Sequence, residues 1–121
     1  MNKTIMLVDD STFMRHTLSQ ILTKNNYTVI AEASNGVEAL ELYRKVQPDL
    51  VTLDITMPEM NGIAALEAIM AEDPAARIIM VSAIGQTSFI KQALSAGARD
   101  FIVKPFKEEQ VIQAINRCFE T

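Results

Sequence analysis

The sequence lacks the features that mark secreted, membrane and thiolate-metal proteins. Its 121 residues contain a single cysteine, Cys118, a single histidine and no tryptophan. One cysteine cannot form an internal disulfide, and zinc sites built on thiolates need several cysteines or histidines. No apolar run approaches the roughly 20 residues that span a bilayer, and the N-terminal apolar segment is too short for a signal peptide. We therefore expect a protein of the reducing cytoplasm, with no membrane insertion.

Positive charge is also scarce. The chain has 11 Lys and Arg against 15 Asp and Glu, which gives a formal net charge of −4, and the basic residues form no cluster. Without a basic patch the chain has no electrostatic attraction for a phosphate backbone, so direct nucleic-acid binding is not expected. Apolar residues make up 49% of the chain, the balance of an ordinary globular protein. We expect one domain over residues 1–121, present as a monomer.

Five short apolar runs alternate with longer segments of helical period. The runs that we expect as strands are residues 4–8, 28–33, 50–53, 77–81 and 100–103. This alternation predicts βα units around a parallel sheet. The last three runs are largely continuous in apolar residues, as in strands that are covered on both faces. Helices should therefore lie on both sides of the sheet.

The helical segments show apolar residues at the spacing of one helix face. Middle helices are expected near residues 37–46, 63–70 and 87–96, and Ser11 or Thr12 is placed to cap the first helix. The apolar stripes of the two outer helices are Met14, Leu18, Ile21 and Leu22 in the first, and Val111, Ile115, Cys118 and Phe119 in the last.

Polar residues stand at the ends of four expected strands. Asp9 and Asp10 follow the first, Asp54 the third, Ser82 the fourth and Lys104 the fifth. In an open parallel sheet, ligands bind beyond the carboxyl ends of the strands, where the winding direction reverses. Right-handed crossovers place the first and third strands side by side at that point. Three carboxylates should therefore converge on one pocket.

Converging carboxylates repel one another, so one of them would have a raised pKa unless positive charge is bound. Oxygen ligands with no histidine or thiol nearby suit Mg²⁺. Lys104 supplies further positive charge. A carboxylate that faces Mg²⁺ and an ammonium group is well suited to attack a phosphoryl group, whose negative charge both cations stabilise. Asp54 is the expected nucleophile.

Four segments carry a resemblance to a known family. They are residues 8–11 (VDDS), 53–62 (LDITMPEMNG), 81–83 (VSA) and 101–106 (FIVKPF). Each is a weak motif alone, but in this order on alternating strands they are highly specific. Over essentially its whole length, the chain resembles the response-regulator receiver domains of bacterial two-component signalling. Within that family it is most similar to the single-domain members that serve chemotaxis.

The resemblance implies a flavodoxin-like (βα)5 fold, a doubly wound parallel sheet with strand order 2-1-3-4-5. It also implies that Asp10, Asp54 and the backbone carbonyl of Thr56 ligate Mg²⁺, while Asp9 acts largely through bound water. Asp54 would take a phosphoryl group from the phosphohistidine of a sensor histidine kinase. Ser82 and Lys104 would then hold the phosphoryl oxygens.

The resemblance further implies a switch. Phe101 would turn inward when Ser82 moves, and the bond between Lys104 and Pro105 would be cis. The output surface would be formed by the fourth helix, the fifth strand and the fifth helix. A target such as the flagellar motor switch would read this surface, and a phosphatase could end the signal.

Two further positions bear on how long the phosphoryl group would last. Thr56 and Ile84 occupy positions that in the family influence how water reaches the acyl phosphate, and we expect the apolar Ile84 to slow self-dephosphorylation.

A receiver cut from a larger regulator, or a phosphorelay intermediate, remains an alternative. A phosphatase that forms an aspartyl phosphate is disfavoured, because Thr56 stands where that superfamily has its acid. We expect no enzyme, but a switch that promotes only its own phosphorylation and dephosphorylation.

Overall fold

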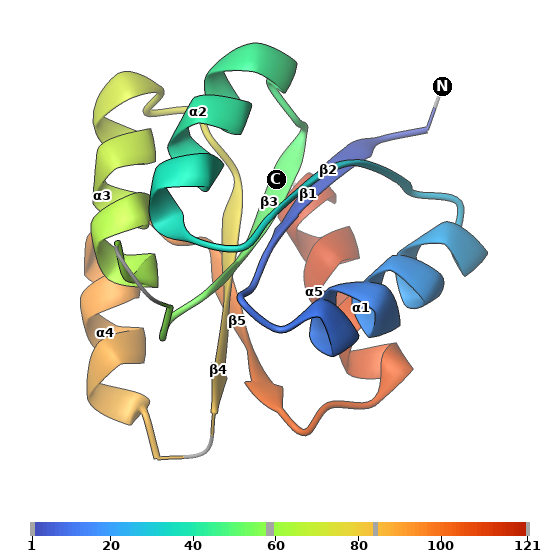
Figure 1. Ribbon diagram of the computed structural model, residues 1–121. Coiled ribbons are helices and arrows are strands. Elements are labelled where there is room, and N and C mark those ends of the chain that lie inside the picture. Colours follow the sequence, from blue (N-terminus) through green and yellow to red (C-terminus); the bar gives the residue numbers. More distant parts are fainter. Residues whose placement is uncertain (1, 58–59, 84, 121) are drawn as a thin grey trace.

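The computed structural model describes residues 2–57, 60–83 and 85–120, which form a three-layer α/β structure (Figure 1). The sheet has five parallel strands in the order β2-β1-β3-β4-β5, as the resemblance implied. The strands are β1 (Thr4–Val8), β2 (Thr28–Ala33), β3 (Leu50–Asp54), β4 (Ile78–Ala83) and β5 (Asp100–Lys104). The helices are α1 (Thr12–Lys24), α2 (Gly36–Val46), α3 (Gly62–Glu72), α4 (Thr87–Ser95) and α5 (Glu108–Glu120).

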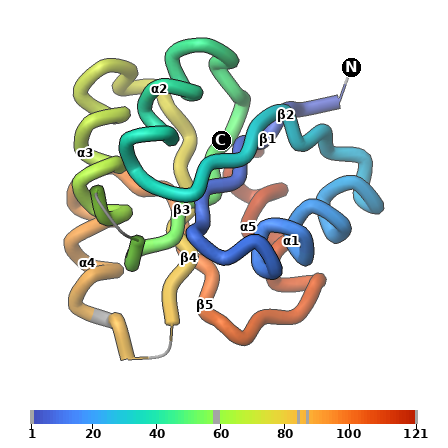
Figure 2. Tube along the Cα trace, viewed as in Figure 1, coloured from blue at the N-terminus to red at the C-terminus, as the bar shows by residue number. Residues whose placement is uncertain are grey.

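Helices cover both faces of the sheet. Figure 1 shows α2, α3 and α4 on one face and α1 and α5 on the other, and the Cα trace in Figure 2 shows the same division. This division follows from the strand order, because right-handed crossovers change face when the chain reverses its direction of travel across the sheet. The reversal lies between β1 and β3, where the ligand site of such a sheet is expected.

Each face of the sheet has its own apolar core. Ile5 and Leu7 of β1 pack with α1 and α5, whereas Met6 and Val8 of the same strand belong to the core beneath α2, α3 and α4. All four side chains are at most 2% exposed. Burial on both faces explains why β1, an interior strand of the sheet, is a continuous apolar run without polar alternation. Burial of such a side chain contributes roughly 1.5–3 kcal/mol, so the sheet is a firm base for polar groups at its edge.

Three of the polar residues at the strand ends, Asp54, Ser82 and Lys104, lie within the strands themselves. We expected β3 and β5 to end one residue before Asp54 and Lys104, and β4 to end before Ser82, but ladder pairing continues through all three residues. Asp54 pairs with Val81. Pairing with a neighbouring strand fixes the backbone of these residues, so their side chains start from rigid positions.

Side-chain caps begin three of the helices. Ser11, Asn35 and Asn61 accept hydrogen bonds from backbone N–H groups three residues onward, at 3.1, 2.9 and 2.9 Å. The structure selects Ser11 over Thr12 as the first cap, because Thr12 is already helical. Caps of this kind typically contribute about 1 kcal/mol. In the described part of the chain, no helix is long and apolar enough to cross a membrane.

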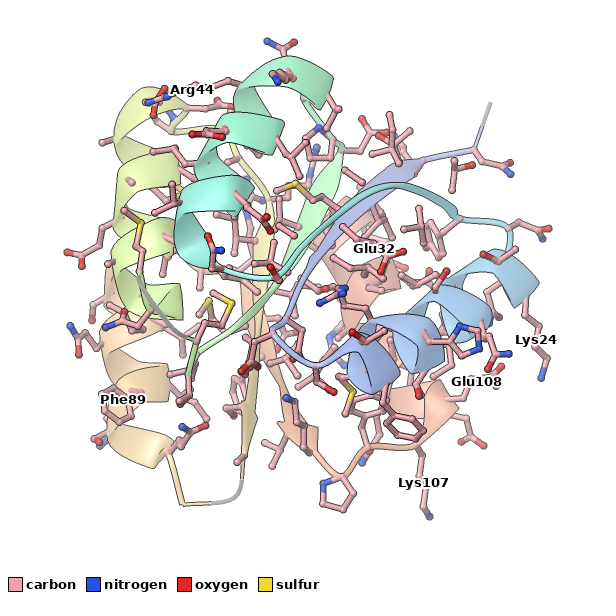
Figure 3. All side chains as sticks on the ribbon, in the orientation of Figure 1. Lys24, Glu32, Arg44, Phe89, Lys107 and Glu108 are labelled. Atoms are coloured by element: carbon pink, nitrogen blue, oxygen red, sulfur yellow. The ribbon has the colours of Figure 1, made fainter. Side chains whose placement is uncertain are left out.

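Exposed ion pairs join neighbouring helices. Lys24 of α1 lies 3.3 Å from Glu108 of α5 (Figure 3). Arg44 of α2 lies 2.8 Å from Glu72 of α3. Solvent-exposed pairs of this kind contribute little to stability, because water and salt screen their charges. The fold therefore depends on its two cores more than on these charges.

Candidate functional site

Three carboxylates converge at the carboxyl end of the sheet. One oxygen each from Asp9, Asp10 and Asp54 can be chosen so that all lie within 4.8 Å of one another. They meet because β1 and β3 are direct neighbours, with Val8 paired to Leu53 immediately before the acidic residues. Asp9 and Asp54 are only 3% and 6% exposed, whereas Asp10 is exposed. The structure thus brings together the three carboxylates that the sequence predicted would share a pocket.

Lys104 reaches into the same site from β5. Its Nζ lies 3.2 Å from Asp9 Oδ2 and 3.5 Å from Asp54 Oδ1. Because β4 separates β5 from β3, a long and flexible side chain is needed to reach these carboxylates. One ammonium group faces three carboxylates, so the site carries excess negative charge.

The charge imbalance changes the titration of Asp54. Burial raises the pKa of Asp54 to about 6, and repulsion from Asp9 adds to this effect, while Lys104 opposes it. Without another cation, Asp54 therefore ionises less readily than an ordinary aspartate, and its protonated form predominates below about pH 6. A bound cation at this position would reverse that preference by direct attraction.

The donor set fits Mg²⁺. All three side chains offer carboxylate oxygens, and the exposure of Asp10 leaves room for the water ligands that Mg²⁺ keeps. Asp9 is already engaged, because its Oδ1 accepts a hydrogen bond from Ser11 N at 2.9 Å and its carbonyl accepts one from the Arg15 guanidinium. Asp10 and Asp54 are therefore better placed than Asp9 for direct ligation.

Ser82 is buried beside this site. Its side chain is fully buried, and its hydroxyl has no hydrogen-bond partner within the part of the chain that the structure describes. A buried hydroxyl without a partner costs roughly 1–3 kcal/mol, so a persistent one indicates either a role or an additional group. Ser82 does not hydrogen-bond the Asp54 carboxylate in this structure.

Gly62 packs closely against the backbone of Asp54. A Cβ added to Gly62 would lie 2.0 Å from the carbonyl oxygen of Asp54, a contact that only glycine avoids. Gly62 also donates its N–H to Ile55 O at 2.8 Å. The loop after β3 therefore folds back tightly against the strand end. Sequence reasoning gave Gly62 no role, although it lies in the segment that carried the resemblance.

Gln86 is a second residue whose role sequence reasoning missed. Its Oε1 accepts a hydrogen bond from Ala83 N at 2.7 Å, and its Nε2 donates one to Thr56 Oγ1 at 2.8 Å. A glutamine directly after a turn glycine and just before a helix was the available signal. It links the end of β4 to the loop after β3.

The remaining predicted features, and the single histidine of the chain, differ in where the structure places them. Phe101 of β5 is 39% exposed and therefore points outward here. The peptide bond between Lys104 and Pro105 is cis, as the resemblance implied. His16 is exposed on α1, away from any metal-binding group among the described residues. Ile84 lies outside the described residues.

Comparison with known proteins agrees with this geometry. Residues 5–116 match the family described as response regulator receiver domain. The chemotaxis protein CheY of Thermotoga maritima is 53% identical over 117 residues, which cover 97% of this chain and 98% of that protein. The chemotaxis protein CheY of Bacillus subtilis is 56% identical over 113 residues, or 93% of this chain and 94% of that protein.

A solved structure shows the same fold. A chain in the crystal structure of the CheX-CheY-BeF3-Mg+2 complex from Borrelia burgdorferi has a TM-score of 0.93 and 42% identity to this chain, with coverage of 97% of this chain and 89% of that one. The matches extend over nearly the whole chain and include both strands that carry the acidic residues. The chain therefore belongs to the response regulator receiver domain family.

Proposed function

We propose that this chain is a phosphoacceptor response regulator of a chemotaxis two-component system, in which Asp54 takes a phosphoryl group from a histidine kinase. The observation that carries the proposal is the convergence of Asp9, Asp10 and Asp54 within 4.8 Å, with Lys104 beside them. The assignment to chemotaxis is supported by the names of relatives that share about half of their residues with this chain.

The proposed reaction is a transfer between two protein side chains. A carboxylate oxygen of Asp54 attacks the phosphorus of the phosphohistidine, so that a P–O bond forms as the P–N bond breaks. The electron pair of the broken bond stays on the imidazole nitrogen, which takes up a proton. Lys104 stabilises the negative charge on the transferred oxygens, because its Nζ already lies 3.5 Å from Asp54 Oδ1.

The metal site of the proposal is built on the same residues. We assign Asp10, Asp54 and the backbone carbonyl of Thr56 as ligands, with Asp9 acting through bound water. Mg²⁺ bound there supplies charge neutralisation for the phosphoryl group. The presence of Mg²⁺ with BeF3 in the Borrelia burgdorferi complex supports this choice of metal.

Phosphorylation would be read at a surface away from Asp54. Ser82, whose buried hydroxyl has no partner among the described residues, would hold a phosphoryl oxygen, and Phe101 would turn inward in response. Phe101 also lines a surface cavity of about 290 Å³ together with Pro105, Gln113 and Arg117. The surface of α4, β5 and α5 is therefore the proposed docking site for a target such as the flagellar motor switch.

The proposal also covers the protein partners of the chain, its oligomeric state and its location. The Borrelia burgdorferi structure contains CheX together with CheY, which supports a protein partner for this chain as well, and we propose a phosphatase among its partners. The receiver domain spans residues 1–121 in this proposal and acts as a cytoplasmic monomer. It promotes its own phosphorylation and dephosphorylation, and it has no other substrate and no nucleic-acid partner.

The acceptor can be tested by intact mass after incubation with acetyl phosphate and Mg²⁺. We expect one added phosphoryl group in the wild type, and loss of this addition in Asp54→Asn or in the presence of a chelator. Asp49→Asn is the matched control, because Asp49 precedes the other end of β3, and it should be labelled like the wild type. Labelling that persists in Asp54→Asn would contradict the assignment of the acceptor.

A further inference from the structure

A side-chain bridge connects the two loops that flank the site. Gln86 Oε1 accepts a hydrogen bond from the N–H of Ala83 at 2.7 Å, and Gln86 Nε2 donates one to the Thr56 hydroxyl at 2.8 Å. The backbone N–H of Gln86 also donates to the carbonyl of Ala83 at 3.3 Å. We call the two side-chain hydrogen bonds of Gln86 the Gln86 clamp. Both have the length of well-formed hydrogen bonds.

The clamp holds residues that neighbour the phosphoryl-binding groups. Ala83 directly follows Ser82, so a backbone shift of Ser82 toward a phosphoryl oxygen would also move the Ala83 N–H that the clamp holds. Thr56 supplies its hydroxyl to the clamp, and its backbone carbonyl is a proposed metal ligand. One glutamine thus ties the segment that would hold the phosphoryl group to the loop that would help to hold Mg²⁺.

Gly85 lies in open space directly before Gln86. It has a φ of +96°, a conformation that favours glycine, and an added Cβ would meet nothing within 4 Å. Gly85 itself is therefore not packed against a neighbouring element. Gln86, by contrast, is held by its hydrogen bonds to Ala83 and Thr56, directly before α4 starts at Thr87.

We propose that Gln86 is a positioning residue, and that the Gln86 clamp favours the unphosphorylated conformation and opposes binding of a phosphoryl group at Asp54. The inference rests on the proposed function, because it takes Ser82 to move when it holds a phosphoryl oxygen. A ligand shifts a conformational equilibrium only through contacts that differ between the two states. The clamp is such a contact, and it acts in favour of the unliganded state.

Beryllofluoride with Mg²⁺ provides a direct probe, since it binds reversibly in place of the phosphoryl group. Gln86→Met removes both hydrogen bonds of the clamp, whereas Thr56→Val removes only the bond between Gln86 and Thr56. Thr56→Val should lower the half-saturating concentration about two- to tenfold, the range expected for loss of one net hydrogen bond, and Gln86→Met should lower it at least as much. The double variant should bind no more tightly than Gln86→Met, because Gln86→Met already removes the bond that Thr56→Val removes. Gln92→Met makes the same chemical change at an exposed position of α4 and should leave binding unchanged.

Amide hydrogen exchange of Ala83 in the Mg²⁺-free protein gives a second readout. Exchange should be faster in Gln86→Met than in the wild type and in Gln92→Met, because the acceptor for the Ala83 N–H is removed. This measurement does not depend on phosphorylation chemistry. Unchanged Ala83 exchange in Gln86→Met would mean that the hydrogen bond from Ala83 to Gln86 does not form. Faster exchange with unchanged beryllofluoride binding would mean that the bond forms but does not affect ligand binding.

The outcomes distinguish the clamp from the proposed function. Weaker or unchanged binding in Gln86→Met, or additive effects in the double variant, would overturn the clamp while leaving Asp54 as the acceptor. If the wild type bound no beryllofluoride and accepted no phosphoryl group, the proposed function would fail, and with it the regulatory role of Gln86. Tighter binding with non-additive effects and faster Ala83 exchange would establish the clamp.

Discussion

Two aspartates stand at opposite ends of the central strand β3, and their surroundings shift their pKa values in opposite directions. Asp49 precedes the strand, and its Oδ2 accepts hydrogen bonds from the N–H and the hydroxyl of Thr4 at 2.8 and 3.1 Å. These bonds, with the backbone N–H as the largest cause, hold the pKa of Asp49 below its usual range. Asp54 ends the strand, and burial together with Asp9 raises its pKa to about 6.

The difference shows how one strand serves both stability and function. At the amino end, each donor of Thr4 meets the negative charge of Asp49, so ionisation stabilises the fold. At the carboxyl end, the buried carboxylates outnumber the single ammonium group of Lys104, so ionisation opposes the fold. A metal ion bound at that end would neutralise the excess negative charge.

The largest expected effect comes from removing the charge of Asp54. In metal-free protein at pH 7, Asp54→Asn should raise the free energy of unfolding by up to about 3 kcal/mol, since a shift from 3.8 to about 6 corresponds to 1.36 kcal/mol per pKa unit. The native state binds more protons than the unfolded state between these values, so wild-type stability falls as pH rises from about 4 to 6. Urea unfolding at several pH values measures this.

The same experiment contains its own control. Near pH 4, Asp54 is already neutral in the native wild type, so the gain from Asp54→Asn should shrink toward zero. A gain that is the same at pH 4 and pH 7 would mean that packing, and not charge, causes the effect. A loss of stability at pH 7 would contradict the assigned imbalance of charge.

A smaller effect of opposite sign is expected at the other end of β3. Asp49→Ala should lower the free energy of unfolding at pH 7 by about 2 kcal/mol, because hydrogen bonds to a charged acceptor contribute roughly 1.5–3 kcal/mol. Asp49→Asn keeps an acceptor oxygen for Thr4 and should lose less. Since the native pKa of Asp49 is lowered, its contribution is present above the unfolded pKa and is lost as pH falls through the native one.

Denaturant unfolding at pH 7 and pH 3 checks this prediction. The free energies of unfolding of the wild type and Asp49→Ala should differ less at pH 3 than at pH 7. Those of the wild type and Asp54→Asn should already be similar at pH 4. Equal losses in the Ala and Asn variants would show that the hydrogen bonds from Thr4 do not account for the stabilisation.

The smallest expected effect concerns the affinity for Mg²⁺. Because Mg²⁺ binds the ionised carboxylate and the metal-free pKa of Asp54 is about 6, lowering the pH from 7 to 5 should weaken binding about tenfold. Calorimetric titration at both pH values, with buffers of different ionisation enthalpy, measures the affinity and the proton release. Affinity that does not change with pH would remove Asp54 from the ligand set, whereas Asp49→Asn should leave the pH dependence intact.

Local sequence patterns were enough to predict most of the fold. The apolar runs of β1 and β3 and the stripes of α1 and α5 were identified because side-chain periodicity reflects the covered faces directly. The strand ends were placed one or two residues too early, since Asp54, Ser82 and Lys104 are polar and yet continue the ladder. Cross-strand pairing overrides residue preference at these positions.

The contacts of some site residues could not be predicted from the sequence. Gly62 lies against Asp54 O, and Gln86 binds Thr56 across 30 positions of the chain, so neither contact can be read from local spacing. Asp9, Asp10 and Asp54 were predicted because the carboxyl ends of parallel strands share an edge. The topology rule gives the edge that residues share, but it does not give their hydrogen-bond partners.

The alternation of strands and helices, the order of the motifs and the groups at the strand ends follow from the amino-acid order alone. The folded arrangement is what buries Asp54 and raises its pKa, and what pairs Asp49 with Thr4 and lowers the pKa of Asp49. The two residues are the same amino acid beside the same strand. Their difference comes from desolvation and from donors on distant segments, and these are set only when the chain is folded.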